Sequence, residues 1–171
     1  MKKVRFIWFI LISLRILAAC TAEEPVEVRT VPDDFSFALT WNTYGISTYD
    51  SQTGKLIKTT DAANPADFVT QYHLTEENTA YVFDLLSALD INSYPNEYDP
   101  GSGTSKPSMT LILTLRVNGT VKTIRAENIA QSFVSADEKG QQFLSVCEAI
   151  SNLLTETEEW KALPEYEKLY E

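Results

Sequence analysis

The stretch SMTLILTLRVNGTVKTIRA, residues 108–126, decides the fold class of this chain. Its first ten residues alternate apolar and other side chains, which is the pattern of a β-strand with a buried face. Asn118 and Gly119 follow, and this pair is a strong hairpin signal because both residues tolerate the positive φ angles of a two-residue turn. The stretch therefore predicts an antiparallel hairpin in which Val117 lies opposite Thr120.

Apolar residues fall on both faces of this predicted hairpin. Ile124 of the second strand joins the leucine-rich face of the first strand, whereas Ile112 and Val121 point to the opposite face. We therefore expect the hairpin to be partly covered on both sides. The leucine-rich face carries Met109, Leu111, Leu113, Leu115 and Val117.

The chain before the hairpin predicts further strands. Residues 35–60 contain the aromatic and β-branched runs FSFALTWN, ISTYD and KLIKTT, which predict two or three antiparallel strands. Gly54 precedes the third run and suits a short loop that needs one positive φ angle. Residues 68–74 predict one further short strand.

Two segments carry the start signals and the period of helices. Thr75 is followed by two glutamates, so a hydroxyl cap and first-turn acids favour a helix that ends near Asp90. A capping box from Ser135 to Glu138 begins the second helix, and a short helical tail surrounds Trp160. The apolar stripes are Val82, Leu85, Leu86 and Leu89 in the first helix, and Phe143, Cys147, Ile150 and Leu154 in the second.

This order of elements predicts an α+β fold. Residues 35–171 are expected to form a single domain, because the chain shows no internal repeat and no second domain. Hairpin-linked strands favour an antiparallel sheet of about four to six strands, with two helices packed on one face.

The first nineteen residues have the composition of a secretory signal peptide. Three basic residues lie within the first five positions, and the apolar run FIWFILISL occupies residues 6–14. As a helix this run rises about 14 Å, roughly half of a hydrocarbon core of about 30 Å. We expect this leader to be cleaved rather than to span a membrane.

Leu17, Ala18, Ala19 and Cys20 close the leader. They resemble the lipobox of bacterial lipoproteins, in which the cysteine receives a diacylglyceryl thioether and the leader is cleaved before it. The resemblance implies lipidation of Cys20 and a membrane anchor on the extracytoplasmic face, for which two acyl chains suffice. Arg15 departs from this pattern because its charge interrupts the hydrophobic region, and an ordinary secretory leader is the alternative.

A polar segment with two prolines and no period follows, over residues 20–34, and predicts a flexible tether. Its residues after Cys20 reach at most ~45–50 Å when fully extended, so the domain is expected to work close to the membrane. The predicted organisation is a signal peptide over 1–19, a lipidated cysteine and tether over 20–34, and the domain over 35–171.

The charge of the chain excludes one class of partner. The whole chain has 14 basic and 24 acidic residues, and cleavage after residue 19 would remove four basic and no acidic residues. Nucleic-acid binding depends on cationic patches, so a nucleic-acid partner is not expected. Anionic lipid headgroups would also repel this surface, so the membrane contact depends on the lipid on Cys20.

The sequence offers no recognisable catalytic set. His73 is the only histidine and precedes a helix cap, where a solvated or locally hydrogen-bonded ring is expected. Cys147 shares the apolar stripe of the second predicted helix and is expected to pack in the core. No GxSxG, HExxH or paired CxxC motif occurs. We expect no enzyme activity and no cofactor.

Residues 91–107 hold three prolines and two glycines and are expected to be irregular. Oxygen ligands gather there, which makes a calcium site an alternative to a plain acidic loop. The EF-hand order fails at Tyr94 and Pro95, so no metal ligands are assigned. The oxygen-bearing residues are Asp90, Asn92, Asn96, Glu97 and Asp99.

Aromatic residues cluster in or beside the predicted turns, and two interpretations compete. Such rings are good contact residues for a partner or a sugar, but the favoured interpretation is that they fill the ends of the core, with Trp41 its first member. The candidate contact residues are Tyr44, Tyr49, Tyr72, Tyr94, Glu97, Tyr98 and Asp99.

Together these patterns predict a membrane-anchored extracytoplasmic lipoprotein that acts as a protein-interaction or accessory module. Its partner is expected to be an envelope protein that offers a basic or aromatic patch. The alternative is a ligand-binding domain for wall glycan, peptide or calcium.

Overall fold

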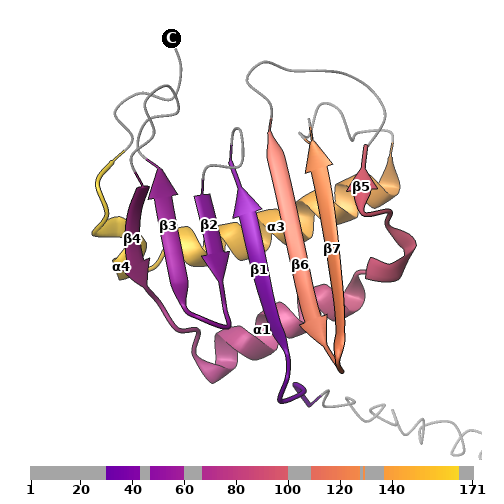
Figure 1. Cartoon of the computed structure of the whole chain (residues 1–171), viewed down its shortest axis with the longest axis horizontal. Helices are drawn as coiled ribbons and strands as arrows, with labels where there is room; N and C mark the ends of the chain where they lie inside the picture. Colours follow the sequence, from indigo (N-terminus) through magenta and orange to yellow (C-terminus); the bar gives the residue numbers. More distant parts are fainter. Residues whose placement is uncertain are drawn as a thin grey trace, which may run out of the picture.

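The computed structural model describes residues 30–42, 47–59, 67–99, 109–127, 129 and 137–165. These residues form one seven-stranded sheet in the order β4-β3-β2-β1-β6-β7-β5, with helices on one side of it (Figure 1). The predicted signal peptide, Cys20 and the tether up to residue 29 lie outside the described residues. The α+β fold predicted from the sequence is confirmed.

All neighbouring strands pair antiparallel except β5 and β7, which pair parallel. The strands are β1 (Ser36–Trp41), β2 (Ser47–Asp50), β3 (Lys55–Thr59), β4 (Asp67–Gln71), β5 (Glu97–Tyr98), β6 (Thr110–Val117) and β7 (Thr120–Glu127).

The hairpin predicted around Asn118 and Gly119 is confirmed. Val117 pairs with Thr120, and the two turn residues have φ angles of 51° and 71°. Both values are positive, which matches the type of turn that suits the twist of the flanking strands. The alternate leucines of β6 are buried, and Ile124 of β7 joins them as predicted.

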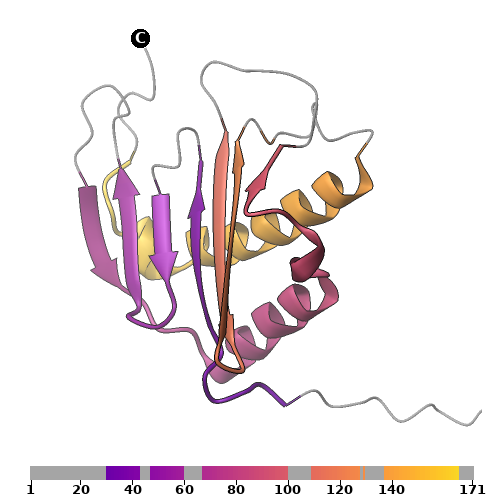
Figure 2. The ribbon, with the colours of Figure 1, turned by 45° about the vertical axis from the view of Figure 1, so that its right-hand side comes forward.

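Both predicted helices cover the same face of the sheet (Figure 2). Helix α1 (Glu76–Ala88) begins as expected, because the Thr75 hydroxyl accepts a hydrogen bond from the Asn78 amide at 3.1 Å. A 3₁₀ turn, η1 (Ile91–Ser93), follows it. Helix α4 (Glu158–Lys161) is capped by the Thr157 hydroxyl and contains Trp160.

The start of helix α3 (Glu138–Thr155) differs from the prediction. Its N-cap is Asp137, whose side chain makes no capping hydrogen bond, and its first helical residue is Glu138. The predicted capping residue, Ser135, lies outside the described residues. The helix therefore begins later than the capping box indicated. The Asp137 carboxylate instead accepts a hydrogen bond from the Tyr98 hydroxyl.

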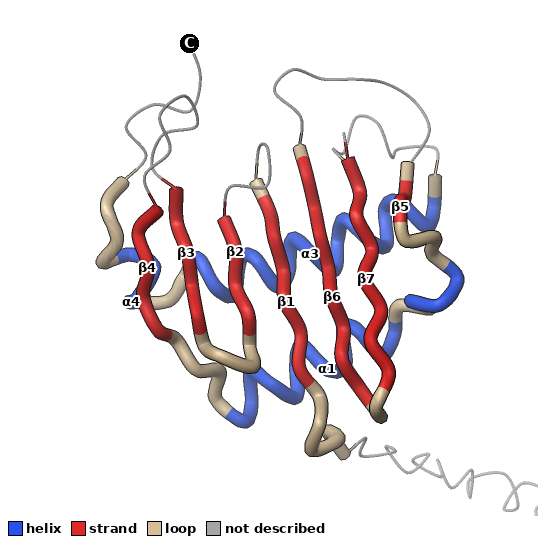
Figure 3. The backbone as a smooth tube through the Cα atoms, viewed as in Figure 1, coloured by secondary structure: helices blue, strands red, loops and turns tan. Residues whose placement is uncertain are grey.

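The two long helices cross the sheet in opposite directions. Helix α1 carries the chain from the β4 side toward the β5 edge, and α3 returns from the β5 edge to the β4 side, where α4 lies (Figures 1 and 3). Each helix therefore packs under several strands.

The core lies between the sheet and these helices, and it contains the residues that the apolar stripes predicted. Cys147 and Ile150 of α3 are 0% exposed, and Trp41 is 5% exposed. The Trp41 ring lies 5.5 Å from the ring of Trp160, and the buried Lys58 ammonium lies 5.0 Å from the Trp160 ring centre. The predicted core position of Trp41 is confirmed.

The sheet differs from the sequence predictions in two details. The sheet has seven strands rather than four to six, because β5 occurs within residues 91–107, which were expected to be irregular. The helices that the structure describes cover one face of the hairpin, and on its other face Ile112 is half-buried and Val121 is 62% exposed. The opposite face of the sheet is called the open face below.

Candidate functional site

Two of the candidate tyrosines lie beneath the β5 edge of the sheet. Tyr94 and Tyr98 are 3% and 8% exposed, and their rings meet edge to face with centroids 5.3 Å apart. Phe143 of α3 packs against both rings, at 5.5 Å and 6.0 Å. The three rings form a buried cluster and not a surface row.

The hydroxyls of these tyrosines contact the start of α3. Tyr98 donates a hydrogen bond to the Asp137 carboxylate, and Tyr94 donates to the backbone carbonyl of Lys139 at 2.9 Å. Burial raises the pKa of both phenols above the ordinary value, so both remain donors at neutral pH. The two tyrosines therefore join the segment around β5 to α3.

Tyr49 lies in the core and Tyr72 at its margin. Tyr49 is 1% exposed, its hydroxyl donates to the backbone carbonyl of Tyr72 at 3.2 Å, and burial raises its pKa to about 12. Tyr72 is half-buried, and its hydroxyl accepts a hydrogen bond from the Asn78 side chain at 3.3 Å. Tyr44 lies outside the described residues. The burial of three candidate tyrosines supports the interpretation that these rings fill the core.

The oxygen-bearing residues near β5 differ in their surroundings. Glu97 and Asp99 are exposed, and the Asn96 side-chain oxygen accepts a hydrogen bond from the Lys122 ammonium at 2.8 Å. Among the residues that the structure describes, no three histidine, cysteine, aspartate or glutamate side chains lie close enough to hold a metal ion. These residues give the calcium alternative no support.

The single histidine and the buried cysteine both have packing roles. The ring of His73 lies against Gly54, so closely that a Cβ atom on Gly54 would be 2.5 Å from it. Cys147 is 0% exposed, and burial raises the pKa of its thiol, which keeps the thiol protonated. The expected core position of Cys147 is confirmed.

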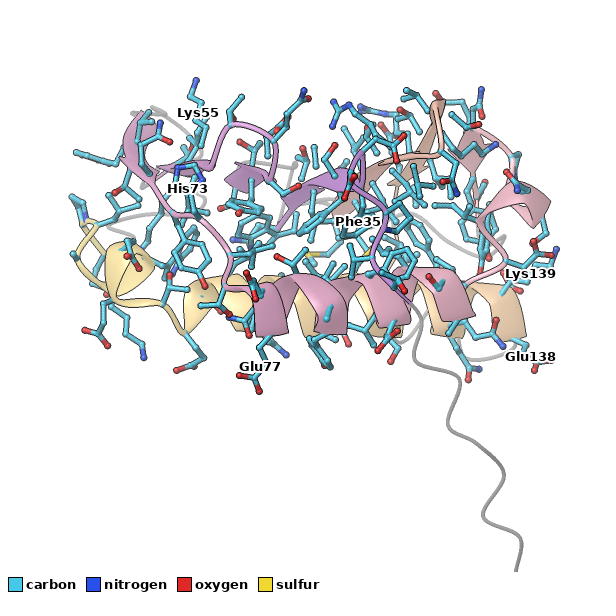
Figure 4. The ribbon with its side chains drawn as sticks, turned by 90° about the horizontal axis from the view of Figure 1, so that it is seen from below. Phe35, Lys55, His73, Glu77, Glu138 and Lys139 are labelled. Carbon is cyan, nitrogen blue, oxygen red and sulfur yellow. The ribbon has the colours of Figure 1, made fainter. Side chains whose placement is uncertain are left out.

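The outer surface of the helix layer is acidic. Helix α1 carries Glu76, Glu77 and Asp84 and no basic residue. Figure 4 shows Glu77 and Glu138 pointing away from the sheet, while Lys55 points away from the helices on the other side of the molecule. The two faces of the molecule therefore differ in chemistry.

The open face of the sheet has an uncharged centre. The strand registers place one side chain from each of five neighbouring strands in a row across this face, and three more residues form an adjoining row over β1, β6 and β7. All eight side chains are half-buried or exposed. We call this surface the threonine band: Val69, Ile57, Thr48, Thr40 and Ile112 in the first row, and Ala38, Thr114 and Thr123 in the second.

Charged residues border the threonine band. At the β7 side, the Arg125 guanidinium binds the Glu127 carboxylate at 2.5 Å. Near the start of β1, the Arg116 guanidinium lies 3.8 Å from the Asp50 carboxylate. The Thr114 and Thr123 hydroxyls hydrogen-bond to each other at 3.0 Å within the band. The band is therefore a weakly polar strip between two charged margins.

A hollow of about 480 Å³ adjoins the margin that contains Arg116. It lies where the start of β1, the turn after β2 and the β6–β7 hairpin meet. Nη1 of Arg116 is buried and has no hydrogen-bond partner among the described residues. No sequence pattern marked this site, because its residues come from three separate segments. Its polar lining includes Asp33, Ser36, Ser51, Gln52, Arg116 and Thr120.

A second hollow, of about 490 Å³, lies between the end of α1 and the same hairpin. Phe35 and Phe83 line it and meet edge to face, with ring centroids 5.1 Å apart. Leu86, Leu115 and Val117 make much of the remaining lining apolar. This hollow belongs to the seam between the sheet and the helix layer.

Comparison with known proteins gives no family to which this chain can be assigned. No protein-family model matches it, and neither a curated protein nor a solved structure does. None of the helices formed by the described residues has the length and apolar character needed to cross a membrane. The candidate site therefore depends on the geometry of this chain alone.

Proposed function

We propose that this chain is a lipid-anchored module on the extracytoplasmic face of a bacterial cell membrane, where it holds an envelope protein through the threonine band. The proposal that a protein binds at the threonine band is based on the uncharged strip across the open face. This strip contrasts with the acidic outer surface of the helices. Charged residues are depleted at the centres of protein interfaces, so the band has the composition of such a centre.

The anchor part of the proposal is supported by the leader and the residues that close it. Leu17, Ala18 and Ala19 before Cys20 match the lipobox pattern, and a polar tether follows. Two acyl chains hold a protein at a membrane without any transmembrane helix.

The two surfaces suggest how a partner is oriented. The net charge of the chain is −10, and α1 adds three acidic residues to the surface opposite the band. A partner with basic groups around a flat, weakly polar patch would be attracted by the acidic molecule and seated on its neutral strip. No reaction is part of this proposal, and the chain acts by binding.

The anchor is tested with two cysteine variants in the native cells. Cys20→Ala is expected to move the protein from the membrane fraction to the soluble fraction, because no lipid can be attached. Cys147→Ala is the matched control, since this cysteine is buried in the core and its loss leaves the anchor in place. Membrane association that survives Cys20→Ala would refute the anchor.

Docking is tested by cross-linking in the same cells, followed by mass spectrometry. Thr40→Lys and Val69→Lys place a charge within the threonine band, and Ser87→Lys places one on the exposed surface of α1 as a control. We expect one recurrent envelope protein to be captured by wild type and by Ser87→Lys, and to be lost with either band variant. Val69 is 51% exposed, so this second variant is expected to fold normally. Capture that is equal in all variants would refute docking through the band.

A further inference from the structure

Arg116, which lines the hollow, has a polar atom that the described residues leave unsatisfied. Nη1 of this residue is buried without a hydrogen-bond partner among the described residues, and its other terminal nitrogen lies 3.8 Å from Asp50. That second contact is long for a hydrogen bond. Buried charged donors are costly to leave unpaired, so this guanidinium favours a further acceptor from outside the described residues.

The carboxylates around the hollow differ in what they bind. Asp50 faces Arg116 from outside the lining, and its Oδ1 accepts hydrogen bonds from the Gln52 and Thr53 amides at 2.9 Å and 3.2 Å. Asp33 is exposed and lines the hollow. Asp34 also lines it, but its carboxylate accepts hydrogen bonds from the Asn118 and Gly119 amides and so serves the fold. The lining of the hollow therefore contains one cationic group, Arg116, and one exposed acidic group outside the hairpin contacts, Asp33.

This charge arrangement selects among ligands by their charge. A simple anion would bind Arg116 but meet the carboxylates of Asp33 and Asp50. A simple cation would meet the guanidinium. A ligand that carries both signs satisfies both groups, and a guanidinium binds a carboxylate through two parallel hydrogen bonds.

We infer that this hollow binds a small zwitterion, an amino acid or a short peptide with free ends, whose carboxylate contacts Arg116 and whose ammonium group contacts Asp33. The volume of about 480 Å³ lies within the range of small-molecule sites. The hydroxyls of Ser36 and Ser51 supply further hydrogen-bonding groups in the lining. This inference depends neither on the lipid anchor nor on a protein partner.

The test uses the full-length chain in mild detergent, with the dipeptide alanyl-alanine as the probe. We expect the melting temperature to rise with millimolar dipeptide, because a ligand that binds only the folded state stabilises it. N-acetyl-alanyl-alanine lacks the ammonium group and alanyl-alaninamide lacks the carboxylate. Each blocked form is expected to bind roughly tenfold more weakly or worse.

Three variants locate the site. Arg116→Gln is expected to abolish the response, whereas Arg125→Gln, on the same face but paired with Glu127, is expected to retain it. Asp33→Asn changes an exposed side chain, so it is expected to fold; it should weaken binding of alanyl-alanine and leave the weak response to the N-acetyl form unchanged. The inference is overturned if no dipeptide raises the melting temperature of wild type, or if Arg116→Gln and Asp33→Asn respond as wild type does.

Discussion

Two glycines with the same backbone angle have different surroundings. Gly54 and Gly119 both have a φ of 71°, a conformation that other L-residues rarely adopt. Nothing lies within 4 Å of a Cβ atom built on Gly119, whereas a Cβ atom on Gly54 would lie 2.5–2.9 Å from three atoms of the His73 ring. The positive φ angle favours glycine at both positions. At position 54 the nearby His73 ring also leaves no room for a Cβ atom.

Alanine substitution separates these two causes. Gly119→Ala is expected to lower the free energy of unfolding by about 1 kcal/mol, the lower end of the cost of a positive φ angle. Gly54→Ala should cost about 2–3 kcal/mol, because displacement of the His73 ring adds to the backbone strain. Chemical denaturation of both variants measures these values.

The matched control for Gly54→Ala is made in a His73→Ala background. Without the ring, the cost of Gly54→Ala should fall to that of Gly119→Ala, since only the backbone term remains. If Gly54→Ala costs the same with and without His73, then contact with the ring does not explain why glycine occupies this position.

Asp34 joins the start of β1 to the tip of the hairpin. The backbone amides of Gly119 and Asn118 donate hydrogen bonds to its carboxylate at 2.6 Å and 3.0 Å. These bonds hold the pKa of Asp34 below its ordinary value. The contribution to stability is therefore present above the unfolded-state pKa, about 3.9, and is lost as the pH falls through the lower folded-state pKa.

Asp34→Asn should remove this acid-dependent contribution. We expect the variant to be less stable than wild type at neutral pH and to lose stability less steeply below about pH 4. Denaturation midpoints across this pH range measure the difference. Asp33→Asn is the control, because that side chain makes neither of these hydrogen bonds. Parallel pH profiles for wild type and Asp34→Asn would contradict the assignment.

The burial and contacts of single side chains were harder to predict from the sequence than the backbone conformations of single residues. The positive φ angles at Asn118, Gly119 and Gly54 followed from residue type, because few other residues adopt them. The burial of Tyr94 and Tyr98 did not, since it depends on Phe143, which is far away in the sequence. The Arg116 nitrogen that has no hydrogen-bond partner in the described part of the chain was missed because its surroundings also come from distant segments.

At the scale of elements, the helices and strands that have strong local sequence signals could be predicted. The β6–β7 hairpin and helix α1 each have a turn or cap residue beside a clear apolar period, and both occur where expected. Strand β5 has only two residues, and its parallel pairing with β7 joins it to a segment that follows much later. No period can reveal so short a strand, because the partner alone defines it.

Helix α3 permits a direct test of the core packing. Cys147 is 0% exposed, and burial raises its pKa, so the reactive thiolate is scarce in the folded protein. In a Cys20→Ala chain, alkylation of Cys147 should be slower than in denaturant by about a thousandfold or more, because the thiol must wait for unfolding. Timed labelling with iodoacetamide and mass spectrometry measures the rate.

The control for this labelling lies two residues away on the same helix. Ser145 is exposed, so Ser145→Cys in a chain that lacks Cys20 and Cys147 should react at the rate of a free thiol. Equally fast reaction of Cys147 would contradict its placement in the core.

At the scale of the whole molecule, the arrangement of the strands could not be predicted. The sheet places β1 between β2 and β6, and the chain passes from β4 at one edge to β5 at the other through α1. The threonine band exists only because this order brings Thr48, Thr40 and Ile112 into one row. Sequence patterns assign a residue to a face of its own strand, but they do not determine which strands are neighbours.

The central place of β1 has a mechanical consequence. The chain enters this strand through a turn closed by the Phe35 amide and the Pro32 carbonyl, so a pull on residues 30–35 acts on β1 once this turn and the contacts of Asp34 with the hairpin have opened. Hydrogen bonds between antiparallel strands run across the strands, and β1 is bonded on both sides, to β2 and β6. Such a pull must shear both sets of bonds together, whereas an edge strand can be peeled away one bond at a time. The sheet therefore resists a pull on this segment more strongly than it would resist the same pull on an edge strand.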